Sequence, residues 1–243
     1  MVPSNSQIQE PISEPIVSPL RWLSAVTTLV LSAVLVATLI VSFVPTVRDT
    51  SSQVVSNQPV LVTIGETSLR VPQNMIRFAN QRTGGALGRL DLALHWPSLS
   101  GYSPDLSQAF NDTGSTSTIV FLTISERTAE FDSTMRLAQI YQPAFLDGEA
   151  TAPDGLMARP LDPQKGYLDE TLYFERGSTR PFVTRCYRGE DTNIPADCLR
   201  EVNMASGLTL SYRFRRAHLN DWRELDATLF SLVANFTKSA AIQ

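Results

Sequence analysis

The sequence predicts an α+β domain in which an antiparallel sheet of about six to eight strands packs against one or two helices, preceded by a single transmembrane helix. Three observations support this prediction. Residues 22–44 contain no charged side chain, apolar and polar residues alternate repeatedly between positions 60 and 214, and the C-terminal stretch from Asp221 carries one apolar stripe. Alternation with period two indicates strands with one buried face, whereas a spacing of three to four indicates an amphipathic helix.

The apolar run is long enough to cross a membrane. Residues 22–44 have the sequence WLSAVTTLVLSAVLVATLIVSFV. As a helix this run would extend about 35 Å, compared with about 30 Å for a hydrocarbon core. A cleaved signal peptide has a shorter apolar region and a small-x-small cleavage site, whereas this run ends in Phe43-Val44-Pro45. We therefore expect an uncleaved anchor; a cleaved signal peptide and a buried helix of a soluble domain are the alternatives.

The charges that flank this run do not decide its orientation. Arg21 is offset by glutamates in the preceding tail, and Arg48 is followed by Asp49. The charges at the two ends of the run are therefore nearly balanced, and the positive-inside rule favours neither orientation clearly. The only two cysteines, Cys186 and Cys198, lie after the run, and an isolated close pair suits an oxidising compartment. The excess of arginine over lysine is typical of a GC-rich bacterial genome. We expect a bacterial inner-membrane protein with a cytoplasmic N-terminus and a periplasmic C-terminal domain.

The segments that flank the anchor are expected to lack regular structure. Residues 1–21 are polar and carry four prolines, which predicts a short disordered cytoplasmic tail. Residues 45–59 are rich in Ser, Thr, Asn and Gln and show no periodicity, which is typical of a flexible linker. The remaining residues, 60–243, have the length of one domain.

The greater part of this domain is expected to be β-strand. Alternating apolar residues on either side of Gly65-Glu66 predict a hairpin over residues 60–71, and residues 90–96 place four large apolar side chains on one face of a strand. The further expected elements are a short helix at 73–80, a loop at 83–88, a surface excursion at 97–117, a central strand at 118–124, a helix at 131–141, irregular chain or a short hairpin at 147–170, and strands at 171–174, 182–187 and 208–214.

An amphipathic helix is expected to close the chain. Asp221 and Glu224 have the spacing of a capping box at a helix start. The apolar residues that follow at helical spacing are Trp222, Leu225, Leu229, Leu232, Val233 and Phe236. One such stripe is suited to covering the apolar face of the preceding strands.

The cysteine pair predicts a disulfide. Cys186 and Cys198 bracket the polar segment YRGEDTNIPAD, and strands on either side of it would bring the two thiols together. Free thiols and a redox or metal site are the alternatives. The CxxC spacing of redox and zinc sites is absent, and neither histidine lies close in sequence.

Reactive groups show no catalytic pattern. The sequence contains two histidines, His95 and His218, and lacks GxSxG, HExxH, P-loop and GxGxxG motifs. We therefore assign no catalytic, cofactor-binding or metal-binding residue. Six carboxylates lie in the irregular stretch, too unevenly spaced for a calcium loop: Asp147, Glu149, Asp154, Asp162, Asp169 and Glu170.

Basic residues near the end of the chain form a candidate patch. Arg213, Arg215 and Arg216 are its members, and Arg200 and Arg223 are candidate neighbours. A solvated sheet face paired with acidic neighbours is the alternative interpretation. The net charge of the whole chain is −4, which does not favour nucleic acid as a partner.

Two functional hypotheses follow. The first is a single-pass membrane-anchored envelope protein whose extracytoplasmic domain binds a protein or another envelope component, because a tether is present and a reactive constellation is absent. The second is a membrane-tethered periplasmic hydrolase with a non-contiguous active site built from His95 or His218 and the loop carboxylates. The sequence does not specify a ligand, a pathway or an oligomeric state.

Overall fold

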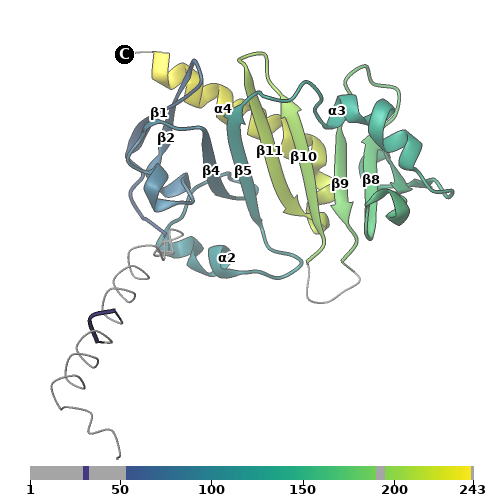
Figure 1. Cartoon of the computed structure of the whole chain (residues 1–243), viewed down its shortest axis with the longest axis horizontal. Helices are drawn as coiled ribbons and strands as arrows, with labels where there is room; N and C mark the ends of the chain where they lie inside the picture. The colour runs from purple at the N-terminus through teal and green to yellow at the C-terminus, as the bar shows by residue number, and fades with distance from the viewer. Residues whose placement is uncertain (1–29, 33–52, 190–194, 242–243) are drawn as a thin grey trace, which may run out of the picture. The chain divides into compact units, whose positions relative to one another are not determined.

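The computed structural model describes residues 30–32, 53–189 and 195–241 (Figure 1). The chain divides into two compact units, residues 1–48 and 49–243. Within the first unit, residues 30–32 are helical. The predicted tail, most of the predicted anchor at 22–44 and the first part of the predicted linker lie outside the described residues. A search of the described residues finds no helix with the length and hydropathy needed for a membrane span.

The second unit contains an eight-stranded sheet in the order β4-β5-β11-β10-β9-β8-β7-β6. Every neighbouring pair in it is antiparallel. The predicted α+β class with an antiparallel sheet is therefore confirmed. The strands are β4 (Arg89–His95), β5 (Ile119–Glu126), β6 (Ala150–Thr151), β7 (Leu156–Pro160), β8 (Glu170–Glu175), β9 (Val183–Tyr187), β10 (Asp197–Asn203) and β11 (Leu208–Arg215).

A smaller sheet precedes the large one. The predicted hairpin is formed by β1 (Pro59–Ile64) and β2 (Thr67–Pro72). The expectation of a loop at 83–88 is wrong in part, because β3 (Gly85–Ala86) pairs in parallel with β1. Gly84 makes this approach feasible: it has a φ of +73°, and a Cβ there would lie 2.5 Å from the carbonyl oxygen of Leu61.

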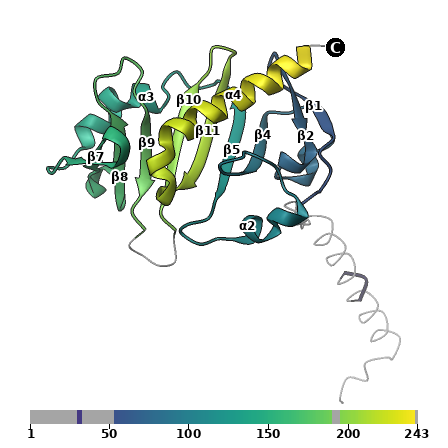
Figure 2. The ribbon, with the colours of Figure 1, turned by 180° about the vertical axis from the view of Figure 1, so that it is seen from behind.

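The predicted C-terminal helix covers one face of the large sheet. Helix α4 (Trp222–Ala241) follows directly on a 3₁₀ segment, η8 (Arg216–Asp221). It crosses the strands in Figure 2 and also packs on β2. Its stripe of Trp222, Leu225, Leu229, Val233 and Phe236 is buried. These side chains share one core with inward residues of β1, β2, β4, β5 and β11.

Short helices lie toward the two ends of the sheet. On the β4 side they are η1 (Gln73–Met75), η2 (Ala79–Gln81), η3 (Pro104–Leu106) and α2 (Ser107–Asn111). The expected helix at 73–80 is therefore wrong in form, since this stretch makes two separate 3₁₀ turns. The expected helix at 131–141 is present as α3 (Ser133–Arg136) and a π-helical continuation, η4 (Leu137–Tyr141), followed by η5 (Gln142–Ala144).

The α3–η5 segment covers a second, smaller core. Tyr141 and Ala144 pack there with side chains from β8, β9 and the loop before β8, namely Leu161, Leu172, Phe174 and Val183. In Figure 1 the sheet is seen from the face opposite α4, and no helix crosses in front of β5 and β11. We call this uncovered part of the sheet the open face.

Candidate binding surface

The disulfide that the cysteine spacing predicts is present. Cys186 on β9 and Cys198 on β10 are directly opposed residues and are bonded to each other. Both are 0% exposed and belong to the main core. A fully buried crosslink between two strands suits a structural role better than a redox role, since exchange needs access to the sulfur.

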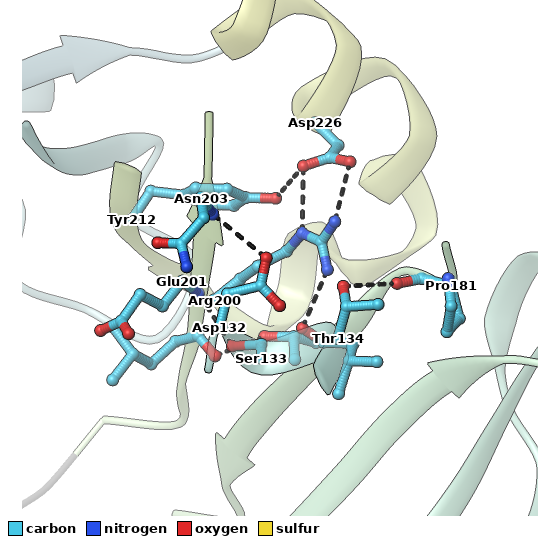
Figure 3. Close-up of polar contacts among 12 residues, drawn as sticks. Asp132, Ser133, Thr134, Pro181, Arg200, Glu201, Asn203, Tyr212 and Asp226 are labelled. Carbon is cyan, nitrogen blue, oxygen red and sulfur yellow. Dashed lines mark hydrogen bonds and ion pairs between the residues drawn. The ribbon is translucent and has the colours of Figure 1, made fainter. Parts of the chain in front are cut away.

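Two residues further along β10, Arg200 lies in a buried polar network below α4 (Figure 3). Its guanidinium donates to both carboxylate oxygens of Asp226, at 3.1 and 3.3 Å, and to the carbonyl of Val183 at 3.2 Å. The Tyr212 hydroxyl donates to the same carboxylate at 2.6 Å. Burial raises the pKa of Tyr212 well above its ordinary value, and the charge of Asp226 acts in the same direction. Arg200 therefore holds α4 on the sheet through its ion pair with Asp226.

The start of α3 accepts hydrogen bonds from the part of β10 that is not paired with β9. Paired residues of β9 and β10 extend only to Leu199, so the following N–H groups of β10 need other acceptors. Ser133 accepts from the backbone N–H of Glu201 at 2.9 Å, and Asp132 accepts from that of Asn203 at 3.1 Å (Figure 3). Asp132 also caps α3 by accepting from Met135 N–H. This junction fixes one border of the open face.

The open face carries a row of directly opposed side chains across five strands. In the order β4, β5, β11, β10 and β9 they are Ala93, Phe121, Arg213, Leu199 and Arg185. The Leu199 side chain is 39% exposed. In this row Leu199 therefore lies between two arginines, Arg213 and Arg185, and the apolar pair Ala93 and Phe121 lies next to Arg213.

Two guanidinium groups contact one aromatic ring in this row. The Cζ atoms of Arg77 and Arg213 lie 4.6 and 5.0 Å from the ring centroid of Phe121, within the range of a cation–π interaction. Arg77 comes from the turn between η1 and η2. Burial lowers the pKa of Arg77 from its ordinary value and the charge of Arg213 lowers it further, while the charge of Asp91 on β4 acts in the opposite direction. The two cations are therefore close enough to affect each other.

Arginines exceed carboxylates on this face. Arg213 and Arg215 share Asp197, at 3.5 and 2.5 Å. Arg136 pairs with Glu201 at 2.9 Å and Arg185 with Glu170 at 3.3 Å. Among the described residues, Arg77 forms no ion pair. With the Arg89–Asp91 pair on the same face of β4, six arginines lie near four carboxylates, although the whole chain has a net charge of −4.

The predicted basic patch is brought together only in part. Arg213 and Arg215 lie side by side around Asp197, as alternate residues of β11. Arg216 begins η8, where its backbone N–H donates to Ala196. Arg200 lies inside the core, and Arg223 pairs with Asp154 at 2.5 Å. Sequence reasoning missed Arg77, for which no local motif gives a signal.

A cavity of about 580 Å³ opens beside Arg77. Its walls include Asn74, Arg82, Tyr102, Phe110 and Phe121. The Tyr102 and Phe110 rings meet edge to face at 5.5 Å. Arg82 donates to the carbonyls of Ile76 and Arg77, both at 3.0 Å, so it stabilises the turn that presents Arg77.

Asn74 ties this turn to the loop after β4. Its side-chain N–H donates to the carbonyl of Tyr102 at 3.1 Å, and its own carbonyl accepts from Tyr102 N–H at 2.9 Å. Gly101 makes this approach feasible, because a Cβ there would lie 2.6 Å from the Asn74 carbonyl. The Oδ1 atom of Asn74 is buried and has no hydrogen-bond partner among the described residues.

The histidines and loop carboxylates lie elsewhere. His95 Nδ1 is 3.3 Å from Ser98 Oγ, and His218 Nε2 is 3.0 Å from the Ser117 carbonyl. Neither histidine lines the cavity. Glu149, Asp154, Asp169 and Glu170 each pair with arginine, Asp162 caps a 3₁₀ turn and Asp147 is exposed. Within the described ranges, no cluster of three His, Cys, Asp or Glu residues is arranged to hold a metal ion.

Comparison with known proteins identifies a similar fold. No protein-family model matches the chain, and no curated protein matches it. Among solved structures, this chain is similar to an immunity protein of the Stenotrophomonas maltophilia type IV secretion system. The match covers 74% of this chain and 94% of the immunity protein, with 16% identity and a TM-score of 0.52. A second match, to the iron-regulated outer membrane lipoprotein FrpD of Neisseria meningitidis, covers 78% of this chain and 98% of FrpD, with 13% identity and a TM-score of 0.44. The first similarity shows a shared fold alone, and we base no inference on the second.

Proposed function

We propose that residues 60–243 form an envelope domain that binds a protein partner through the open face, while residues 22–44 hold it on the inner membrane with the domain in the periplasm. The observation that carries this proposal is Leu199, an exposed leucine between Arg213 and Arg185 in the middle of an uncovered sheet. Arginine and aromatic side chains are enriched where protein interfaces bind most strongly.

The similar fold is compatible with this proposal. The solved neighbour is described as an immunity protein of a secretion system, and we propose a role in binding another protein for this chain. The hydrolase hypothesis lacks equivalent support, because neither histidine lines the cavity. We therefore propose a binder, with the buried disulfide and the Arg200–Asp226 pair stabilising its sheet.

Site-specific photocrosslinking in intact cells tests the proposal. A photoreactive amino acid at Leu199 should capture a discrete protein partner. The same group at Leu168, which is 72% exposed and lies outside the row, should not capture it. The captured protein, once purified, should bind the wild-type chain and the Leu168→Glu variant, and should bind Leu199→Glu at least about tenfold more weakly. Equal capture or equal binding at the two positions would refute the open face as the interface.

A further inference from the structure

Arg77 is a partly buried cation that forms no ion pair with any described carboxylate. Its guanidinium lies against the rings of Phe121 and Phe78, at 4.6 and 5.0 Å. Removing a charge from water without a counter-ion is unfavourable. Burial and the neighbouring Arg213 lower the pKa of this group more than the nearby Asp91 carboxylate raises it, so an added anion at the guanidinium would be stabilised.

Arg200 shows how the same fold satisfies a comparable group. Its Cζ atom lies 4.5 Å from the ring centroid of Phe182, and its guanidinium also donates to both oxygens of Asp226. Arg77 has the aromatic contact but no ion pair among the described residues, since the nearby Asp91 is paired with Arg89. A carboxylate from another molecule would complete at Arg77 the arrangement that Asp226 completes at Arg200.

A peptide with an acidic side chain offers such a carboxylate, which can accept from the Arg77 guanidinium. The volume of about 580 Å³ and the aromatic walls of Tyr102, Phe110 and Phe121 are compatible with a short peptide segment. The excess of arginine on the adjoining open face would attract an acidic segment toward a chain that is acidic as a whole.

We propose that the Arg77 cavity binds an acidic segment of the protein partner, with one Asp or Glu carboxylate at the Arg77 guanidinium. This inference rests on the proposed protein-binding function and specifies the chemistry of the partner. Arg77 is a binding residue in this scheme, and Arg82 positions the turn that carries it.

Fluorescence anisotropy with defined peptides tests the inference on the full-length protein in detergent. The probe is a fluorescein-labelled Gly-Glu-Glu-Glu-Gly peptide, and peptides with Gln or Lys in place of Glu serve as ligand controls. We expect the Glu peptide to bind at least about tenfold more tightly than the Gln peptide, and Arg77→Gln to remove this preference. The matched control is Arg70→Gln, since Arg70 lies on β2 opposite the exposed Leu61; it should leave binding unchanged.

A second variant keeps the inference falsifiable if Arg77→Gln folds poorly. Arg77→Lys, which keeps the charge but not the forked donor geometry, should bind the peptide with intermediate affinity. Binding as tight as that of the wild-type protein would overturn the assignment of the carboxylate to the Arg77 guanidinium.

Competitors identify other occupants. Inorganic phosphate or free glutamate that displaces the peptide as strongly as unlabelled peptide would overturn the peptide assignment in favour of a small-anion site. Phosphatidylglycerol nanodiscs that bind through Arg77, when the peptide does not, would overturn it in favour of a lipid headgroup. Equal binding of the Glu and Gln peptides would overturn the inference outright.

The outcomes also separate this inference from the proposed function. If Leu199 captures a partner but Arg77→Gln has no effect on that partner or on the peptide, the cavity assignment fails and the open-face proposal stands. If the peptide binds through Arg77 but Leu199 captures nothing, the open-face proposal fails and the cavity remains an acidic-peptide site.

Discussion

Replacing Asp226 by alanine should destabilise the domain more than any comparable surface change. Asp226 is the only described carboxylate paired with Arg200, whose side chain is 5% exposed. The variant leaves that guanidinium with the Val183 carbonyl at 3.2 Å and the Phe182 ring. It also removes the acceptor of the fully buried Tyr212 hydroxyl. Two buried polar groups thus lose a partner in one substitution.

The expected loss is about 3–5 kcal/mol in the free energy of unfolding, because an uncompensated buried charge remains. A typical domain has about 5–15 kcal/mol in total, so much of the stability would disappear. The matched control is Asp154→Ala, which breaks the pair with Arg223. The side chains of that pair are 49% and 51% exposed, and an exposed ion pair contributes only about 0–1 kcal/mol.

Urea titration followed by tryptophan fluorescence measures both variants, since Trp222 is buried at the start of α4. A second variant separates the unpaired charge from lost packing. The double substitution Arg200→Met, Asp226→Leu removes both charges and should recover most of the stability lost in Asp226→Ala. If Asp226→Ala costs no more than Asp154→Ala, or if the double variant is as unstable as the single one, the unpaired-charge explanation is wrong.

Three other predictions address topology, the disulfide and pH. A reporter active only in the cytoplasm, fused after Gln243, should be silent; strong activity would contradict a periplasmic domain. Replacing both Cys186 and Cys198 by serine should lower the free energy of unfolding in urea by roughly 3 kcal/mol, given the sequence separation of 12; an unchanged value would contradict this. Because the pKa of Tyr212 is raised above 10.0, the folded protein holds this proton where the unfolded chain loses it. Stability should therefore fall above about pH 10, by up to about 1.4 kcal/mol per pH unit; Tyr212→Phe should reduce that slope, and an identical slope would count against the assignment.

Local patterns were sufficient for the parts of the fold that bury one continuous apolar face. The hairpin at 60–71, the strand that became β11 and the C-terminal helix each alternate or repeat regularly. Strand β10 (Asp197–Asn203) was not expected, because its inward positions are Cys198, Arg200 and Val202. A charged residue interrupts the apolar face there, and the carboxylate that makes this tolerable lies on α4, 26 positions away. No local pattern carries that information.

The candidate site depends on contacts of the same long-range kind. Arg77 follows a 3₁₀ turn in a stretch whose apolar residues suggested a helix. Its ring partner Phe121 comes from β5, and the cation that shares this ring, Arg213, comes from β11. The sequence did indicate that Arg213 and Arg215 share one strand face, because period two requires it. It could not indicate that Asp197 neutralises part of that charge or that an unpaired arginine lies beside it.

Arg77 and Arg200 together explain why only one face of the sheet is proposed to bind a partner. Both guanidinium groups lie within 5 Å of an aromatic ring centroid. On the covered face, helix α4 supplies the carboxylate of Asp226 and closes the network. On the open face, no described helix crosses β5 and β11 to supply one (Figure 1), and the Phe121 ring and the Arg77 side chain line the cavity. The same physical requirement that fixes the helix on one face therefore makes an acidic peptide the expected ligand on the other.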